Sequence, residues 1–584
     1  MRDQTFEDLL GLRIIDEVRL SKDGDLIGAI VSENFREYRK KEQRKEVYLF
    51  DRNFKIIAKY EGYGLHSLCF TPAGSVLFAE GKDIVSLKGD GLPLKYSTGI
   101  KVNSVSFFGG KIIFTGEKED KKGSDDAYFF EEEDRFTDLY RIDESGIVRL
   151  TQDLQIWEFA SADDAVYAIA SDCPQESCWY KSKVFRITAD GKQELIYDPG
   201  RRQIGKITAH GTRIAFLESV MSDRGVISGD VILYDGSIRN ITDGSNISYS
   251  HVVLHGDSIY VLGNDKTTFS IMDISNKREI WYGFGIVYPA YSPSFDTANG
   301  SFVVPFSSPT DPPEIYRIED GISKSSLNSH LADIAAYPAE IVEWRSSDGE
   351  DIYGILRVRN PEDPLIVYVH GGPTSFSYAS FIDRTSIYLG YGFSVFAPNY
   401  RGSVGKGRRF AELNVGDLGG MDFEDILSGI DHLKRSGKIR TERIYITGGS
   451  YGGYMSALAV MKTDIFKASV SLFGISDWIS FHGTSNLYLW DRLHMDADPW
   501  DFDKYDRYSP IRIRHDPKTP VLLMHGIRDP YVPIGQYYEF YRFLKEKGCE
   551  VRMLVFPREG HGFTEKDHIK RQYLETIKFM KDHS

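Results

Sequence analysis

Two patterns of hydrophobic and polar residues follow one another along the chain. Residues 18–325 carry short runs of β-branched and aromatic residues, separated by turns that contain Gly, Asp or Asn. Beyond about residue 340, apolar runs of strand length alternate with stretches in which apolar residues recur at helical spacing. The first pattern predicts an all-β domain, and the second predicts an α/β domain with a largely parallel sheet.

The N-terminal residues predict a short helix that packs on another domain. Thr5 is a suitable helix cap, Glu7 and Asp8 lie in the first turn, and apolar residues follow at helical spacing up to residue 16. We therefore assign residues 1–17 to a helical extension.

An internal repeat runs through the all-β region. Each copy has a turn and an alternating strand, followed by a second apolar strand. The turn-and-strand half recurs at residues 21–29, 71–79, 108–114, 161–168, 209–216, 254–261 and 297–304. Seven copies at about the 40–50-residue period of a propeller blade predict a seven-bladed β-propeller over residues 18–325. A pair of β-sandwiches is the alternative.

The second region has the layout of an α/β-hydrolase. Its strand-like runs lie at residues 352–356, 365–369, 393–397, 443–447, 468–472, 521–524 and 551–555. Amphipathic stretches at residues 422–436 and 536–547 lie between them. We place the domain boundary within residues 322–338 and assign residues 326–584 to an α/β-hydrolase domain.

The net charge and the N-terminal sequence limit the binding partners and the cellular location that we expect for this protein. A net charge of −14 over 584 residues argues against nucleic acid or an anionic membrane as a partner. The most basic stretch, residues 36–46, is interrupted by glutamates and predicts a solvated loop or strand edge. Residues 1–5 include an acid, no signal-peptide core follows and no run could span a bilayer, so we expect a cytoplasmic protein.

The cysteines predict neither a metal site nor a disulfide framework. Cys69, Cys173, Cys178 and Cys549 are too few and too scattered for either. Cys173 and Cys178 could pair across a loop, but free thiols are the default expectation in a chain of this size.

One glycine-rich motif has the context of a nucleophile elbow. Ser450 lies between Gly448 and Gly452, after the apolar run 443–447 and before the helix-prone residues 456–461. In such an elbow the serine sits at the tip of a strand-to-helix turn, where a Cβ at the glycine positions would clash with neighbouring backbone. The context favours Ser450 as a nucleophile over a serine in an ordinary loop.

Asp529 and His561 complete the order Ser, Asp, His that this fold requires. A serine hydroxyl needs a base, and the base needs an acid that orients it. Asp529 follows the strand-like run 521–524, and His561, between two glycines, follows the run 551–555. Either alone could be an ordinary loop residue, but together they favour a catalytic triad that needs no metal or cofactor.

Two backbone N–H groups are predicted to stabilise the oxyanion of the tetrahedral intermediate. One belongs to Tyr451, directly after the nucleophile. The other belongs to Gly372, in the sequence HGGP at residues 370–373, which follows the strand-like run 365–369. A plain turn is the alternative for this second loop.

These motifs resemble those of the prolyl oligopeptidase family of serine peptidases, above all its acylaminoacyl-peptidase branch. They are HGGP at 370–373, NYRGS at 399–403, GGSYGG at 448–453, HGxxD at 525–529 and GHGF at 560–563. The resemblance is strong in residues 340–584 and only architectural in the propeller. It implies cleavage of short peptides, access restricted by the propeller, and a homo-oligomer. Members of the branch remove an N-acylated residue from a peptide, and several also hydrolyse esters and arylamides.

Substrate anchoring departs from the family at one position. Relatives often carry an arginine two positions after the triad aspartate, where it can hold a substrate carbonyl, but this chain has Tyr531. We therefore expect anchoring to differ and to use Arg528 or a propeller residue.

An acidic cluster at residues 129–136 bears on the substrate's N-terminus. Dipeptidyl aminopeptidases of this superfamily bind a free α-ammonium group with paired propeller glutamates, and Glu131 and Glu132 are the candidates here. A solvated acidic loop is the alternative that we favour.

The main hypothesis is a serine exopeptidase that releases N-acylated amino acids from short peptides. A dipeptidyl aminopeptidase and a carboxylesterase are the alternatives, and the complete triad disfavours a non-catalytic propeller scaffold. The apolar residues that could line a specificity pocket, or equally well the core, are Phe473, Trp478, Phe481, Leu487 and Trp490.

Overall fold

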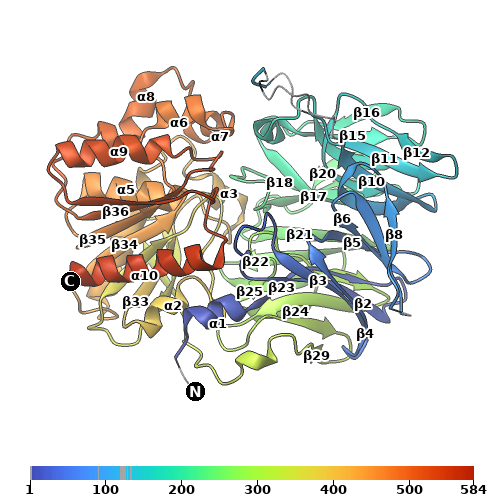
Figure 1. Cartoon of the computed structure of the whole chain (residues 1–584), viewed down its shortest axis with the longest axis horizontal. Helices are drawn as coiled ribbons and strands as arrows, with labels where there is room; N and C mark the ends of the chain where they lie inside the picture. The colour runs from blue at the N-terminus through green and yellow to red at the C-terminus, as the bar shows by residue number, and fades with distance from the viewer. Residues whose placement is uncertain (1–2, 90, 119–126, 128, 132–134) are drawn as a thin grey trace.

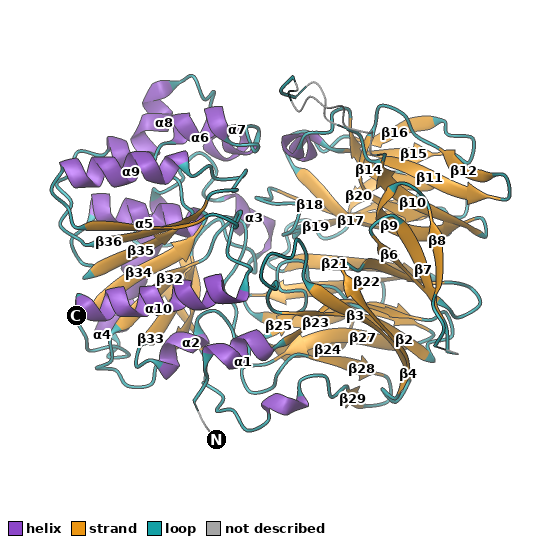
Figure 2. Ribbon diagram, in the orientation of Figure 1, coloured by secondary structure: helices purple, strands orange, loops and turns teal. Residues whose placement is uncertain are grey.

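The computed structural model describes residues 3–89, 91–118, 127, 129–131 and 135–584 of the chain. Two domains lie side by side, an all-β domain formed by the N-terminal half and an α/β domain formed by the C-terminal half (Figure 1). Colouring by secondary structure shows helices concentrated in the α/β domain (Figure 2). Among the described residues, no helix is long and apolar enough to span a membrane.

The all-β domain is a seven-bladed β-propeller, as the repeat predicts. Six blades are four-stranded antiparallel sheets whose strands follow in chain order, and the seventh has a fifth strand, β26, beside β27. The strands are β1 (Arg13–Leu20), β2 (Leu26–Glu33), β3 (Arg44–Asp51) and β4 (Ile56–Tyr63); β5 (His66–Phe70), β6 (Val76–Glu80), β7 (Asp83–Leu87) and β8 (Leu94–Ser97); β9 (Lys101–Phe108), β10 (Lys111–Glu117), β11 (Asp138–Asp143) and β12 (Gly146–Arg149); β13 (Gln155–Ser161), β14 (Val166–Ser171), β15 (Lys183–Ile187) and β16 (Gln193–Tyr197); β17 (Gln203–His210), β18 (Arg213–Ser219), β19 (Asp230–Tyr234) and β20 (Ile238–Asn240); β21 (Ser248–His255), β22 (Ser258–Asp265), β23 (Thr268–Asp273) and β24 (Arg278–Phe284); and β25 (Ile286–Val287), β26 (Asp296–Ala298), β27 (Ser301–Ser307), β28 (Glu314–Ile318) and β29 (Ile322–Lys324).

The repeat maps onto equivalent strands of successive blades. Each turn-and-strand copy falls on the second strand of a regular blade, from β2 to β22, and on β27 in the last blade. These strands are almost fully buried, because neighbouring sheets cover both of their faces. Burial on both faces favours β-branched and aromatic residues, which is why the repeat is visible in the sequence.

The predicted N-terminal helix is shorter than the sequence indicates. Helix α1 (Phe6–Gly11) has a capping box, in which Thr5 and Asp8 bond to each other's backbone N–H groups. Phe6 stacks on Tyr391 of the α/β domain at 5.1 Å between ring centroids, so the expected packing on another domain is confirmed. The assignment of residues 13–17 to the extension is wrong, because they pair with β2 as the start of strand β1.

The α/β domain is built on one eight-stranded sheet in the order β30-β31-β33-β32-β34-β35-β36-β37, parallel from β33 to β37. Its strands are β30 (Glu340–Arg345), β31 (Asp351–Arg357), β32 (Leu365–Val369), β33 (Ser394–Asn399), β34 (Ile444–Gly449), β35 (Ala468–Leu472), β36 (Val521–Gly526) and β37 (Val551–Phe556). All seven predicted strands are present, and the sequence analysis missed β30, an edge strand paired antiparallel to β31.

Helices cover both faces of this sheet, as expected for an α/β-hydrolase. One face packs on α2 and α10, and the other packs on α4, α5 and α9. The helices are α2 (Ser386–Gly390), α3 (Gly407–Glu412), α4 (Met421–Arg435), α5 (Tyr451–Lys462), α6 (Trp478–Thr484), α7 (Trp490–Met495), α8 (Phe502–Tyr508), α9 (Gly535–Glu546) and α10 (Lys566–Asp582).

The loop between β2 and β3 docks on the α/β domain. Arg36 donates its backbone N–H to Thr564 O at 2.7 Å, and its guanidinium lies 3.1 Å from Glu559 Oε2. Glu559 and Thr564 flank His561 in the sequence. The prediction of a solvated loop over residues 36–46 is therefore wrong at Arg36, whose charge pairs with a buried carboxylate.

Two of the cysteines are paired. The sulfur atoms of Cys173 and Cys178 are 1.99 Å apart and form a disulfide across a five-residue separation. The expectation of free thiols is wrong for this pair, because a short loop brings the two cysteines together. Cys69 and Cys549 are free.

Candidate active site

Ser450 has the backbone conformation of a nucleophile elbow. It lies between strand β34 and helix α5 at φ 59° and ψ −120°, a region that residues with a Cβ rarely adopt. A Cβ at Gly448 or Gly452 would lie 2.2 Å or 2.0 Å from the carbonyl oxygen of Val369. The strained turn is therefore possible only because both flanking positions are glycine.

Asp529 and His561 come together at the ends of neighbouring parallel strands, β36 and β37. Nδ1 of His561 lies 2.7 Å from Oδ2 of Asp529, and the other carboxylate oxygen accepts the backbone N–H groups of Tyr531 and Val532. Burial acts to raise the pKa of Asp529, but hydrogen bonds with His525 and His561 outweigh it and lower the pKa to about 2. The carboxylate therefore stays ionised and orients the imidazole through Nδ1.

His525 is a second histidine on the same carboxylate, which the sequence analysis did not assign. It is fully buried, and its Nε2 lies 2.7 Å from Val532 O and 3.4 Å from Asp529 Oδ2. The HGxxD motif carries this residue, so the signal was present, but only the fold places its ring under the Asp529 loop.

The predicted oxyanion donors lie beside the serine. Tyr451 is the first residue of α5, where a backbone N–H has no partner within the helix. In the HGGP loop, a Cβ on Gly371 would lie 3.2 Å from Ser450 Cβ, and Gly372 has a φ of +120° that suits glycine. Ser450, His561, Tyr451 and Gly372 all line one pocket of about 440 Å³.

A buried acid beneath the elbow holds the Tyr451 side chain. The Tyr451 hydroxyl donates to Asp422 Oδ2 at 2.5 Å and accepts the Gly419 N–H at 3.1 Å. Burial raises the pKa of Asp422 to about 7, against the opposing effect of the Tyr451 hydrogen bond. The sequence offered no signal for this contact, since Asp422 looks like an ordinary first-turn helix acid.

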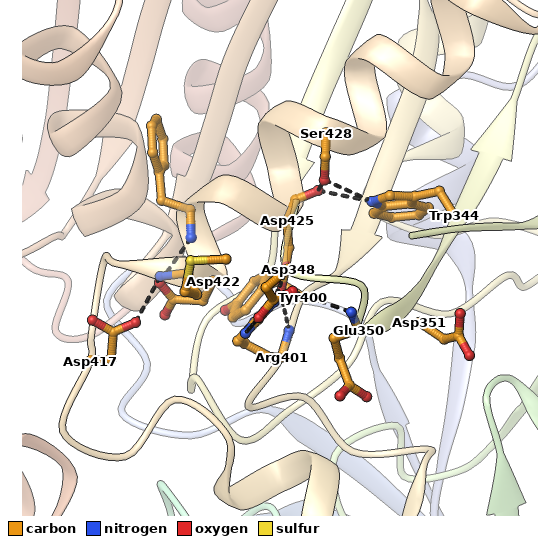
Figure 3. A network of polar contacts seen from close by, with 12 residues as sticks. Trp344, Asp348, Glu350, Asp351, Tyr400, Arg401, Asp417, Asp422, Asp425 and Ser428 are labelled. Atoms are coloured by element: carbon orange, nitrogen blue, oxygen red, sulfur yellow. Dashed lines mark hydrogen bonds and ion pairs between the residues drawn. The ribbon is translucent and has the colours of Figure 1, made fainter. Parts of the chain in front are cut away.

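The same helix carries an ion-pair cluster next to Asp422 (Figure 3). Arg401 lies 2.9 Å from Asp425 through Nε and 2.7 Å from Asp348 through one terminal nitrogen. Arg401 belongs to the NYRGS motif, so its function here is to anchor helix α4 to the loop after β33. Together these contacts fix the helix that supports Tyr451.

Replacing Tyr451 with phenylalanine is expected to lower the free energy of unfolding by about 1–3 kcal/mol, because Asp422 loses its shortest hydrogen bond. An acid with a raised native pKa destabilises the fold increasingly as pH rises from about 4 to its native pKa. Removing the donor raises that pKa further, so the loss should be larger at pH 8 than at pH 5. Urea unfolding at both pH values measures it.

The matched control is Tyr445→Phe. The Tyr445 hydroxyl lies 2.6 Å from the Ser584 hydroxyl and has no hydrogen bond to a side-chain carboxylate among the described residues. Its effect should not depend on pH. An equal loss at pH 5 and pH 8 for Tyr451→Phe would show that the Asp422 contact is not linked to ionisation.

One of the predicted substrate-binding residues lines the pocket, and two others do not. Tyr531 lines the pocket, with its ring centroid 5.5 Å from that of His561. Arg528 and Glu131 are exposed, and neither is among the residues that line the pocket. Glu132 lies outside the described residues. Neither Arg528 nor Glu131 is in the pocket lining, so their role in anchoring the substrate stays a prediction.

An apolar wall of the pocket lies next to His561. Phe473 has its ring centroid 5.0 Å from that of His561, and Phe481, Leu487 and Trp490 line the same pocket. Trp478 does not line it, because it is fully buried and stacks behind Trp490 at 5.7 Å. The sequence could not separate these aromatic residues into wall and core.

Part of the lining comes from segments that no sequence motif marks. The propeller contributes Ser222, Asp223, Val226 and Tyr291. The loop after the HGGP motif contributes Arg384. Blade loops carry little local pattern, so their position near Ser450 depends on how the two domains dock.

Comparison with known proteins supports this architecture. Residues 379–584 match the model of the prolyl oligopeptidase family. The chain is 31% identical over 340 residues to an uncharacterized peptidase, YuxL, of Bacillus subtilis, covering 55% of this chain and 50% of that protein. It is 31% identical over 361 residues to an acylamino-acid-releasing enzyme of Arabidopsis thaliana, covering 58% of this chain and 44% of that protein. The matched part thus spans about half the length of these relatives or less.

The fold is shared over the whole chain. The structure of a Pyrococcus horikoshii acylaminoacyl peptidase superposes with a TM-score of 0.84 at 20% identity, covering 100% of this chain and 98% of that one. Both its propeller and its α/β domain therefore have counterparts here. The segment that matches the model of the prolyl oligopeptidase family, residues 379–584, contains Ser450, Asp529 and His561.

Proposed function

We propose that this protein is a serine exopeptidase that releases N-acylated amino acids from short peptides. The observation that carries the proposal is a single pocket, lined by Ser450 at a strained elbow, by His561 bonded to Asp529, and by both predicted oxyanion donors. Relatives named acylamino-acid-releasing enzymes support the choice of substrate.

The mechanism follows from the roles these groups can take. Ser450 Oγ attacks the scissile carbonyl while His561 Nε2 accepts its proton, and Asp529 holds the other ring nitrogen. The N–H groups of Tyr451 and Gly372 bind the oxyanion that forms. His561 then protonates the leaving amine, and water, activated by the same imidazole, hydrolyses the acyl-enzyme.

The pocket's position supports a preference for short substrates. It lies between the domains, with the β2–β3 loop, helix α1 and a propeller loop in its lining. These segments hinder the approach of a folded protein chain to Ser450. The apolar wall beside His561 suits an uncharged side chain next to the scissile bond.

A dipeptidyl aminopeptidase is the second candidate, and Asp223 is the observation that favours it. This exposed propeller residue brings a carboxylate into the pocket lining, where it could bind a free α-ammonium group. The predicted glutamate at 131 lies elsewhere, so Asp223 takes its place in this alternative.

A matched pair of substrates tests the two candidates. We expect an N-acetylated amino-acid anilide to be cleaved at least about tenfold faster, in kcat/KM, than a dipeptide anilide with a free amine, because unpaired ammonium would be desolvated beside the apolar wall. Chromogenic assays measure both rates. A preference for the free amine that Asp223→Asn abolishes would move the assignment to dipeptidyl aminopeptidase.

The carboxylesterase alternative, the oligomeric state and the cellular location each need a separate experiment. Fast ester cleavage without turnover of any peptide would favour a carboxylesterase. The homo-oligomer stays a prediction that light scattering after size exclusion would check, and the cytoplasmic location stays a prediction for fractionation.

A further inference from the structure

One arginine in the pocket lining is surrounded by tyrosines. Arg384 lies in the loop between β32 and α2, together with one of the tyrosines around it, and the other four come from separate segments of the chain. They are Tyr291, Tyr368, Tyr378, Tyr388 and Tyr573. The pKa of Arg384 is raised, above all by its interaction with Tyr291. Burial acts in the opposite direction, and further tyrosines add to the increase. The pocket thus holds a permanent positive charge among phenol hydroxyls.

Asp383, the acid next to Arg384 in the sequence, accepts hydrogen bonds from other donors. Asp383 Oδ2 accepts from Arg357 at 2.9 Å, in an ion pair that is almost fully buried. Its Oδ1 accepts the backbone N–H groups of Thr385 and Ser386, each at 2.8 Å, and the Thr385 hydroxyl at 2.5 Å. Asp383 therefore has little capacity left to neutralise its neighbour.

No ion pair involves Arg384 within the part of the chain that the structure describes. Although the tyrosines surround it, its side chain keeps a surface that is open to the pocket. A guanidinium without a carboxylate partner, among tyrosine hydroxyls, is well suited to a planar anion, which it can bind through two parallel N–H donors.

We propose that Arg384 binds the C-terminal carboxylate of the peptide substrate, on the leaving-group side of the scissile bond. The inference rests on the proposed function, because a peptide with a blocked N-terminus carries its one obligatory charge at its C-terminus. That carboxylate always belongs to the leaving group, since the acyl group retained on Ser450 ends at the scissile carbonyl. Arg384 then aligns the leaving amine with His561 during acylation.

This role explains how a serine peptidase can select short peptides beyond steric exclusion. An extended peptide advances about 3.4 Å per residue, so only leaving groups of a suitable length can place their carboxylate at Arg384 while the scissile carbonyl is at Ser450. Deacylation should be independent of Arg384, because the leaving peptide has departed by then.

The test uses the full-length protein and a series of N-acetylated peptides with one to four residues after the scissile bond. Each is prepared with a C-terminal carboxylate and with a C-terminal amide. The wild type should cleave the best carboxylate about 10–100-fold faster in kcat/KM than its amide, mainly through KM. Arg384→Gln should remove this preference, and Arg384→Lys should retain part of it.

Two controls separate folding and chemistry from recognition. An N-acetylated amino-acid anilide has no leaving-side carboxylate, so Arg384→Gln should lower its kcat/KM much less than it lowers that of the best carboxylate peptide. Arg440→Gln removes an equal charge from an exposed residue outside the pocket and should keep the carboxylate preference. Equal cleavage of carboxylate and amide by the wild type, or a preference that survives in Arg384→Gln, would overturn the proposal.

A competition assay keeps this inference distinct from the proposed function. Unblocked tripeptides, with a carboxylate or an amide at the C-terminus, are added to the anilide assay as inhibitors. Stronger inhibition by the carboxylate in the wild type, lost in Arg384→Gln, supports the anion site even if no acetylated peptide is cleaved. Equal inhibition by the two tripeptides overturns it, even if the enzyme proves to be an acylaminoacyl peptidase.

Discussion

Ser450→Ala is expected to lower kcat by about 10⁵–10⁶-fold on anilide, ester and peptide substrates alike, with KM nearly unchanged. The elbow places the hydroxyl in the same pocket lining as Tyr451 and Gly372, whose N–H groups are the proposed oxyanion donors. Alanine keeps the Cβ and the strained φ, so the pocket and substrate binding should persist. Steady-state kinetics and labelling with a fluorophosphonate both measure the loss.

Ser456→Ala is the matched control for this variant. Ser456 lies in the same helix, α5, and its buried hydroxyl donates to Gly452 O at 2.7 Å. This control should keep its labelling and its kcat to within a few-fold. Activity that survives in Ser450→Ala would mean that another residue is the nucleophile, and with it the whole assignment of the pocket would fail.

Asp529→Asn is expected to lower kcat by about 10⁴-fold, also without a large change in KM. The carboxylate accepts a hydrogen bond from His561 Nδ1 at 2.7 Å, which leaves Nε2 unprotonated and able to act as the base. An amide can turn its NH₂ group toward the ring and so favour the other tautomer, in which Nε2 carries the proton. The pH dependence of kcat should therefore change, in addition to its maximum value.

Stability gives an independent measure of the same carboxylate. The pKa of Asp529 is lowered from 3.8 to about 2, so its ionisation stabilises the fold above about pH 4, and this contribution is lost as pH falls through about 2. Asp529→Asn should therefore lose more stability, relative to the wild type, at pH 7 than at pH 3. Thermal unfolding at the two pH values measures the difference.

Asp477→Asn serves as the control for Asp529→Asn. Asp477 is a buried carboxylate outside the pocket that caps helix α6 through the N–H groups of Ile479 and Ser480. Its replacement should lower stability but leave kcat within a few-fold. A similar loss of kcat in both variants would indicate that general destabilisation, rather than the orientation of His561, explains the result.

The parts of this protein that sequence patterns predicted are those with local causes. The blades were recognisable because each turn and each doubly buried strand restricts its own residues. The elbow was recognisable because the strand, Gly448, Ser450, Gly452 and the helix are adjacent in the chain. Asp529 and His561 followed from their place after parallel strands, whose carboxyl ends meet at one edge of the sheet.

Errors arose where a residue's role depends on distant parts of the chain. Arg36 resembled a solvated cation, yet it pairs with Glu559 across the domain boundary. Residues 13–17 continued the helical spacing of α1, but pairing with β2 made them a strand.

The sequence by itself determined the architecture, the triad and the chemistry of acyl transfer, because these depend on short motifs and on their order. Only the tertiary structure decided which side chains surround the substrate. Arg384 is left without an acid because Asp383 turns to Arg357, and the tyrosines around it come from five separate segments. Charge, burial and hydrogen bonding are properties of neighbours in space, and for this pocket those neighbours come from separate segments of the α/β domain and from the propeller docked on it.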